Sequence, residues 1–454
     1  KIHQKNCPSK TPLQSDREYP GGPRRREGSG EWVQRPSAIQ PMTTTQRLGL
    51  LFGFLLPLII LLYPADLPLQ PRLALGISIF AILFWTFEPI PIEYTSILML
   101  FLLTLLQIVH FEAAFSAFSG KAVWLIFAGM ALSLGITETP LGERLSQIVI
   151  SRAKTYRRLI LSLHLVGVLM ALLIPSGVVR ILILMPILIS LLKSLHEKPG
   201  SRVSAALILS LVCATYYSGT AVLTASVPNM IILGVLESRG VSIYWGQWLF
   251  YLFPVIGFLR VVVCYLLIRI LIPIDGTPSL APQENHKGQP MAPSEKKVLG
   301  ILLLGILLWA TDTFHGIHPV YIGFTLVLLC YLPGWGPLTP ILLKQVNFPL
   351  LIFITAAFAI GTALEQTGFS QMMAESLTGW FDLSGTSTFF KLGVITYLVA
   401  PFDFLMDTAA VGSVLTPILL DFGARLSLTP LQIAFSTGIG TGLVFTLTLL
   451  PCDG

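Results

Sequence analysis

Apolar runs long enough to cross a lipid bilayer dominate this sequence. Two examples are residues 48–63 and 249–274, which with their flanks reach the roughly 20 residues that a helix needs to span ~30 Å of hydrocarbon. Only 11% of the 454 residues are charged, against about 25% in soluble domains. Because backbone polar groups inside lipid must be satisfied within the chain, such runs predict helices. The sequence therefore predicts an all-α polytopic membrane protein without a soluble catalytic domain.

Two polar segments divide the chain. Residues 1–41 are rich in Pro, Gly and Arg and cannot bury a core, and Met42 opens a sequence typical of a natural start. We therefore predict a disordered or non-native N-terminal tail over 1–41. Residues 275–297 are polar and are predicted to be a cytoplasmic linker. Two membrane units remain, at 42–274 and 298–454.

The two units repeat the same order of motifs. The sequence "WLIFAGMALSLGITETPLGERL", from Trp124, aligns with "LLIFITAAFAIGTALEQTGFSQM", from Leu350, so that the Leu-Ile-Phe triplets and two glycines fall in one register. Further along each unit, "SGVVRILILMPIL" and "TAAVGSVLTPIL" both close on Pro-Ile-Leu. This order predicts a duplicated membrane unit, with the second copy incomplete at the C-terminus.

Loop charges predict how the two units lie in the membrane. From a cytoplasmic N-terminus, crossings are expected near residues 48–63, 72–87, 94–109 and 122–140. The loop that follows, 142–158, is rich in Arg and Lys and falls on the cytoplasmic side, as the positive-inside rule requires. The equivalent loop of the second unit, 369–391, carries Glu375 and Asp382 and falls outside. The second unit is therefore predicted to be inverted relative to the first.

Broken apolar segments suggest how such a repeat could bind a ligand. The block 159–192 has basic residues at both ends, which fits either two short crossings or a re-entrant hairpin; the break at residues 175–177 favours the hairpin. Downstream, "TYYSGTAVLTASVPN" predicts a helix interrupted within the membrane. Its freed N–H and C=O groups suit anions and small cations. An inverted structural repeat with two re-entrant hairpins and broken helices is typical of secondary transporters.

At these residues the chain resembles the divalent anion/sodium symporter family, the carriers of dicarboxylates, citrate and sulfate. The resemblance covers Leu48 to the end and includes "SGTAVLTASVPNMI", which is similar to the family's Gly-Thr and Thr-Pro-Pro-Asn signature. It implies a homodimer, with substrate contacts and sodium coordination at Ser-Asn-Thr triplets on the hairpin tips. Here the tips read Ser176-Gly177-Val178 and Met406-Asp407-Thr408. Both triplets are altered, so neither sodium coupling nor a dicarboxylate substrate carries over from the resemblance.

The candidate site consists of residues at these tips and breaks. The substrate-binding candidates are Ser176, Gly177, Arg180, Thr220, Asp407 and Thr408, and the ion-coupling candidates are Ser218, Gly219, Asn229, Asp407 and Thr441. Thr408 and Asn229 match the family's motifs. Arg180 is an anion ligand, a partner of Asp407 or a snorkelling side chain. Asp407 is a proton carrier, a cation ligand or that partner. The hydroxyls either contact ligand or pack between helices.

These features predict a secondary active transporter of a small divalent anion, driven by a sodium or proton gradient. The alternative is an ion exchanger or oxyanion exporter of the same broad superfamily. An enzyme would need a metal cluster or a catalytic dyad and a channel would need a filter repeat, and neither pattern is visible, so we predict no metal site and no cofactor beyond a coupling Na⁺. The expected partners are a small anion and the lipid bilayer, not nucleic acid. We expect a multi-pass protein of the cell membrane, the inner membrane in a Gram-negative cell, with a cytoplasmic N-terminus.

Overall fold

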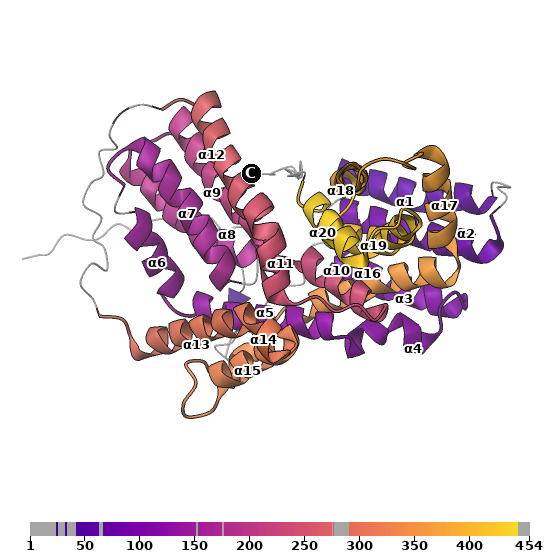
Figure 1. The fold of residues 1–454 in the computed structure, drawn as a ribbon. Helices are drawn as coiled ribbons and strands as arrows, with labels where there is room; N and C mark the ends of the chain where they lie inside the picture. The colour runs from indigo at the N-terminus through magenta and orange to yellow at the C-terminus, as the bar shows by residue number, and fades with distance from the viewer. Residues whose placement is uncertain are drawn as a thin grey trace, which may run out of the picture.

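The structure is a computed structural model, and it describes residues 24–25, 32–33, 42–62, 67–150, 153–174, 177–274, 276 and 290–443. In the tail it describes only two short antiparallel strands, β1 (Arg24–Arg25) and β2 (Trp32–Val33). The predicted disorder of residues 1–41 therefore lies outside the described residues, as does most of the 275–297 linker. Every other regular element among the described residues is helical (Figure 1).

The first half contains a run of helices interrupted by short turns. They are α1 (Thr44–Leu62), α2 (Leu69–Phe87), α3 (Ile92–Leu105), α4 (Phe111–Ala114), the 3-10 turn η1 (Ser116–Ser119), α5 (Lys121–Thr137), α6 (Leu141–Ile150), α7 (Tyr156–Leu173), α8 (Gly177–Ser194), α9 (Arg202–Thr220), the 3-10 turn η2 (Leu223–Ala225), α10 (Val227–Ser238), α11 (Trp245–Leu252), the π-helix η3 (Phe253–Leu259) and α12 (Arg260–Leu271).

The second half repeats most of this order. Its elements are α13 (Pro293–Ala310), α14 (Asp312–His315), α15 (Pro319–Tyr331), the 3-10 turn η4 (Pro340–Gln345), α16 (Phe348–Gln366), α17 (Phe369–Trp380), α18 (Thr388–Leu405), α19 (Thr408–Arg425) and α20 (Pro430–Gly440). Helix α13 begins inside the predicted linker because Glu295 caps its first turn, accepting from the Ala292 N–H at 3.1 Å.

Equivalent helices of the two halves start in the same way. Thr155 caps the start of α7 and Ser387 that of α18, and each hydroxyl accepts a hydrogen bond from the backbone N–H three residues on. Ser201 and Thr429 cap α9 and α20 in the same way. A hydroxyl at this position satisfies one of the N–H groups that a helix start leaves free. The duplication predicted from the sequence therefore extends to the local chemistry of the helix ends.

Packing follows the same equivalence. Helix α7 packs along α9 as α18 packs along α20, and α2 packs on α3 as α13 packs on α15. Helices of the two halves also pack on each other: α5 of the first half packs on α15 of the second, and α16 of the second packs on α3 of the first. Such reciprocal pairing is expected of two related units around a pseudo-two-fold axis. It is the packing expected of the predicted repeat, whose inverted orientation across a bilayer stays a prediction.

The core is divided into two apolar clusters. One is built mainly from α6–α9, and the other joins α2, α3, α5, α10 and α15–α20. Figure 1 shows α6–α9 with α12 on one side of the molecule, and α1–α3 with α16–α20 on the other. Helix α11 lies between the two groups. The two hairpins, α7–α8 and α18–α19, therefore belong to different sides.

Several helices have the length and composition of membrane spans. Among the described residues six pass this test, and a seventh is added if α5 and the start of α6, bent by 69°, count as one broken span. Two of the four crossings expected in the first 140 residues, at α1 and α2, pass this test alone; α5 passes it only with α6, and α3 is a shorter apolar helix. Exposed large apolar side chains on α1 and α12 are consistent with a lipid-facing surface. The predicted all-α polytopic membrane fold is confirmed.

Candidate functional site

The interrupted helix of the first half is closed by Asn229. Helix α9 ends at Thr220, and α10 begins at Val227 with Pro228 in its first turn. Proline is tolerated there because the first turn of a helix does not use its N–H groups in intrahelical hydrogen bonds. The buried Asn229 donates from Nδ2 to the carbonyl oxygens of Thr220 at 2.9 Å and Val222 at 3.1 Å. It thereby satisfies carbonyls that the break leaves free. Its Oδ1 has no hydrogen-bond partner among the described residues.

Arg180 ties the first hairpin to this break. It lies on the first turn of α8, is 1% exposed, and donates from Nη1 to the carbonyl oxygens of Ile174 at 2.7 Å and Ala225 at 3.2 Å. Its Nη2 donates to the Thr215 carbonyl at 3.3 Å. These three carbonyls come from the end of α7, from η2 and from α9. Arg180 therefore donates hydrogen bonds to the carbonyls of the first hairpin and of the interrupted helix, and so joins the two.

The small residues predicted for the first half pack around the same guanidinium. A Cβ on Gly219 would collide with Arg180 Nη2, so only glycine allows this approach. Ser218 is buried and donates to the carbonyl oxygens of Gly167 at 3.1 Å and Ala214 at 2.5 Å. Gly177 starts α8. Ser176 lies outside the described residues, so its predicted role is not addressed.

The described end of the second half meets the break of the first. Helix α20 ends at Gly440, and the buried Thr441 donates to the Gly438 carbonyl at 3.2 Å. A Cβ on Gly442 would lie 2.7 Å from Thr220 Cγ2. The ends of α9 and α20 are therefore in contact because Gly442 has no side chain. The structure thus places the end of α9, with Thr220, against the segment that follows α20.

Arg260, which the sequence analysis did not select, lies at this meeting point. It opens α12 directly after the π-helix η3 and donates from Nη1 to the Gly442 carbonyl at 2.6 Å. Its Cζ lies 5.0 Å from the centroid of the Tyr217 ring on α9, within the range of a cation–π contact. The signal that could have found it is a charge inside the apolar run Trp245–Leu271.

The second hairpin faces a different environment. Asp407 caps α19, accepting from the Ala409 N–H at 2.8 Å, and with Thr408 it lines a pocket of about 540 Å³. Three further carboxylates line this pocket: Glu88, Glu93 and the buried Asp403. The sequence analysis missed them because they come from α2, α3 and the interior of α18. Among the described residues, no three His, Cys, Asp or Glu side chains come together as metal ligands.

Tyr216 is influenced by both kinds of charge. Asp403, Asp407 and Arg260 all act electrostatically on its hydroxyl. Arg180 makes no ion pair with Asp407 in the described part of the chain; it donates instead to the backbone carbonyls of Ile174, Thr215 and Ala225. Cationic groups therefore gather near the broken α9, and carboxylates near the second hairpin.

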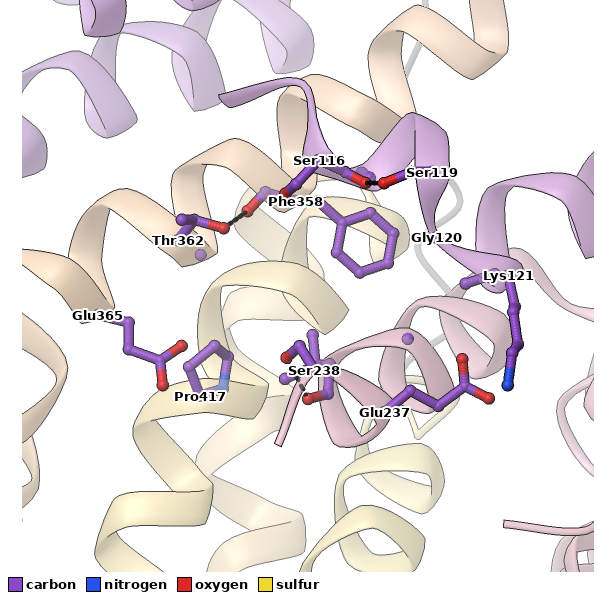
Figure 2. Close-up of a pocket in the computed structure, with 15 residues that line it drawn as sticks. Ser116, Ser119, Gly120, Lys121, Glu237, Ser238, Phe358, Thr362, Glu365 and Pro417 are labelled. Atoms are coloured by element: carbon purple, nitrogen blue, oxygen red, sulfur yellow. Dashed lines mark hydrogen bonds between the residues drawn. The ribbon is translucent and has the colours of Figure 1, made fainter. Parts of the chain in front are cut away.

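A second pocket lies away from these breaks, at the C-terminal ends of α10 and α16. It holds about 390 Å³, and Figure 2 shows Glu237 and Lys121 on one side of it and Glu365 on the other. Arg239 pairs with Glu365 at 3.1 Å and with Asp421 at 2.7 Å. Glu237 accepts from His318. These ion pairs join α10 to α15, α16 and α19, and none of the residues predicted for the site lines this pocket.

Two units of equivalent packing, broken helices that meet, and charges held inside apolar spans define a membrane transporter built from a repeat. Residues 43–450 match the family described as the sodium:sulfate symporter transmembrane region, and the chain belongs to this family. The predicted resemblance to the divalent anion/sodium symporters is thereby confirmed. The chain is accordingly a transporter and not an enzyme.

Curated relatives are distant but cover most of the chain. The L-tartrate/succinate antiporter of Escherichia coli K12 is 25% identical over 352 residues, which are 73% of this chain and 71% of the relative. The L-tartrate/succinate antiporter of Shigella flexneri matches to the same extent. A membrane protein of Cupriavidus necator is 23% identical over 384 residues, 79% of this chain and 74% of the relative.

Proposed function

We propose that this chain carries a small divalent anion of the dicarboxylate, citrate or sulfate class across the membrane, bound where the ends of α9 and α20 meet. The observation that carries this proposal is the presence of two guanidinium groups at one helix break. Arg180 contacts Thr215 and Ala225, and Arg260 contacts Tyr217 and Gly442. Neither forms an ion pair with a described carboxylate. Charges in such a setting call for a counter-ion, and a dianion supplies two negative charges.

The carboxylate side supports coupling to a cation. Asp403 and Asp407 act electrostatically on Tyr216, as Arg260 does, and both carboxylates line the acidic pocket. An anion bound near the guanidiniums and a proton or Na⁺ bound near the carboxylates would each offset a charge that costs free energy in the membrane. The buried Oδ1 of Asn229 is a further oxygen that suits a hard cation. The roles predicted for Ser218, Thr220, Thr408 and Thr441 remain part of this proposal.

Exchange is the second candidate mode of transport. It is favoured by the names of the Escherichia coli and Shigella flexneri relatives, which are antiporters of the dicarboxylates tartrate and succinate. In this mode the counter-substrate takes the place of the cation gradient. Export of an oxyanion belongs to the same candidate. We place the protein in the cell membrane, the inner membrane in a Gram-negative cell, as a homodimer with a cytoplasmic N-terminus.

Uptake into proteoliposomes tests the proposal. Purified protein is reconstituted, and accumulation of labelled succinate, L-tartrate, citrate, sulfate and phosphate is followed, with acetate as the monovalent control. Each is measured with a sodium gradient, a pH gradient, or unlabelled succinate inside. We expect saturable uptake of at least one dianion, against none in protein-free vesicles. Uptake that needs only internal succinate would assign exchange, and absence of saturable dianion uptake under every condition would refute the proposal.

A further inference from the structure

Arg260 occupies a costly position for a charge. It lies in the interior of the 27-residue apolar stretch Trp245–Leu271. Several neighbours on the same helix, including Phe258 and Leu259, are more than half exposed, as expected of a lipid-facing side. Arg260 instead points toward α9 and the end of α20. A guanidinium held inside the protein at this depth is functional by default, because a solely structural role could be filled at lower cost.

The helix is distorted at the point that places this side chain. Residues 253–259 form a π-helix, whose extra residue per turn is frequent at functional sites. Gly257 lets this segment approach α9, since a Cβ there would lie 2.9 Å from Ala221 Cβ. Arg260 follows immediately and reaches Tyr217 and Gly442. The distortion and the close approach together direct the guanidinium to the contact between the two halves.

Arg260 differs from Arg180 in what its donors do. Arg180 is fully buried and already donates to three backbone carbonyls. Arg260 is only partly buried, and among the described residues it donates to a single carbonyl, that of Gly442. A guanidinium has five N–H donors in a planar fork that matches a carboxylate or sulfate with two parallel hydrogen bonds. The cation–π contact with Tyr217 helps to hold the guanidinium in place without using its N–H donors.

We infer that Arg260 binds one negative group of the transported dianion directly, while Arg180 holds the break and contributes a fixed positive charge. This inference rests on the proposed function and names the residue that selects a dianion over a monoanion. The bound group lies against Tyr217 and Thr220 of the first half and Gly442 of the second. A ligand held there touches both repeats, so its binding is sensitive to how the two halves are placed.

Conservative and neutralising variants of Arg260 test this role. Arg260→Lys keeps the charge but loses the planar fork, and Arg260→Gln loses the charge. We expect the KM for succinate uptake to rise about tenfold or more in Arg260→Lys, as for loss of one charge-assisted hydrogen bond. We expect Arg260→Gln to lose the preference for succinate over monomethyl succinate. The matched control is Arg269→Gln in the last turn of α12, where the arginine stacks on Tyr265 at 6.0 Å, and its KM should change less than twofold.

A direct binding measurement separates this inference from the proposed function. The rise in unfolding temperature caused by succinate in detergent reports binding without transport. Wild-type protein that is stabilised by succinate but moves none of it contradicts the carrier function alone. A KM that stays constant in both Arg260 variants while the maximal rate falls would mean that Arg260 only tethers α12 to Gly442. That result, or an equal rise of KM in Arg269→Gln, overturns the inference.

Discussion

The two hairpins occupy equivalent places in the two halves but carry opposite charges in opposite surroundings. In α7–α8, Arg180 is sealed from solvent and bonded to backbone carbonyls of three segments. In α18–α19, Asp407 is exposed at the mouth of a pocket of about 540 Å³ and bonds its own helix start. The first hairpin is hydrogen-bonded to the neighbouring helix break, and the second faces a pocket.

This difference shows how a duplicated unit can divide two tasks. A buried cation with several backbone partners stabilises one arrangement of the chain, because moving it would expose the charge and free the carbonyls together. A carboxylate at a pocket can change its proton or counter-ion without disturbing the fold. Substitutions at Arg180 should therefore act on folding first, and substitutions at Asp407 on transport first.

The largest effect is expected from Arg180→Ala. The change removes the guanidinium donors from the carbonyls of Ile174, Thr215 and Ala225 and opens a cavity, which together cost about 3 kcal/mol or more. We expect a large fall in folded protein, measured as yield and as unfolding temperature in detergent. Arg180→Lys should lose less, because one ammonium can still reach some of these oxygens.

Asp407 supplies the matched comparison for that experiment. If Arg180 existed to neutralise Asp407, the double variant Arg180→Ala with Asp407→Asn would regain the stability that the single change loses. Because the partners of Arg180 are carbonyls, we expect no such rescue. Recovery of the unfolding temperature in the double variant would contradict the division of roles between the hairpins.

A smaller effect on stability, but a clear one on coupling, is expected from Asp407→Asn. Asparagine is as good a helix cap as aspartate, so α19 should still start there and the unfolding temperature should hardly change. The other charged groups that line its pocket, Glu88, Glu93 and Asp403, remain. If Asp407 carries the coupling proton, wild-type uptake rises as the outside pH falls, more steeply than it rises with sodium, and the variant loses this slope. Strong sodium dependence with a flat pH profile in the wild type would instead assign sodium coupling.

The fold was largely predictable because its signals are local. Apolar runs gave the spans, and the Pro-Ser-Gly and Ser-Val-Pro-Asn sequences marked the breaks near residues 175–177 and 221–226. The start of α13 at Pro293 was missed, since the polar residues around it resemble a linker until Glu295 is recognised as a cap. Short capping sequences are weak signals inside a charged stretch.

The site was only partly predictable because its residues meet through tertiary packing. Arg180, Asn229 and Asp407 stand beside breaks that the sequence marks. Arg260 is separated from Tyr217 and Gly442 by long stretches of chain, and only the packing of α12 on α9 brings them together. Gly219 was assigned to ion coupling, whereas the structure gives it a steric reason, namely the room that Arg180 needs.

The smallest expected effect belongs to the test of inversion, which should change neither stability nor transport. Lys154 and Ser384 are exposed residues in the equivalent segments that precede the two hairpins. In a background without native cysteines, Lys154→Cys should react with an impermeant maleimide only from the cytoplasmic face, because the surrounding segment is rich in Arg and Lys. Ser384→Cys should react only from outside, since Glu375 and Asp382 make its segment acidic. The cysteine-free parent is the control for background. Labelling of both positions from one face would mean that the two repeat units have the same orientation in the membrane. The opposite charges of the two hairpins would then lie on the same side of the membrane.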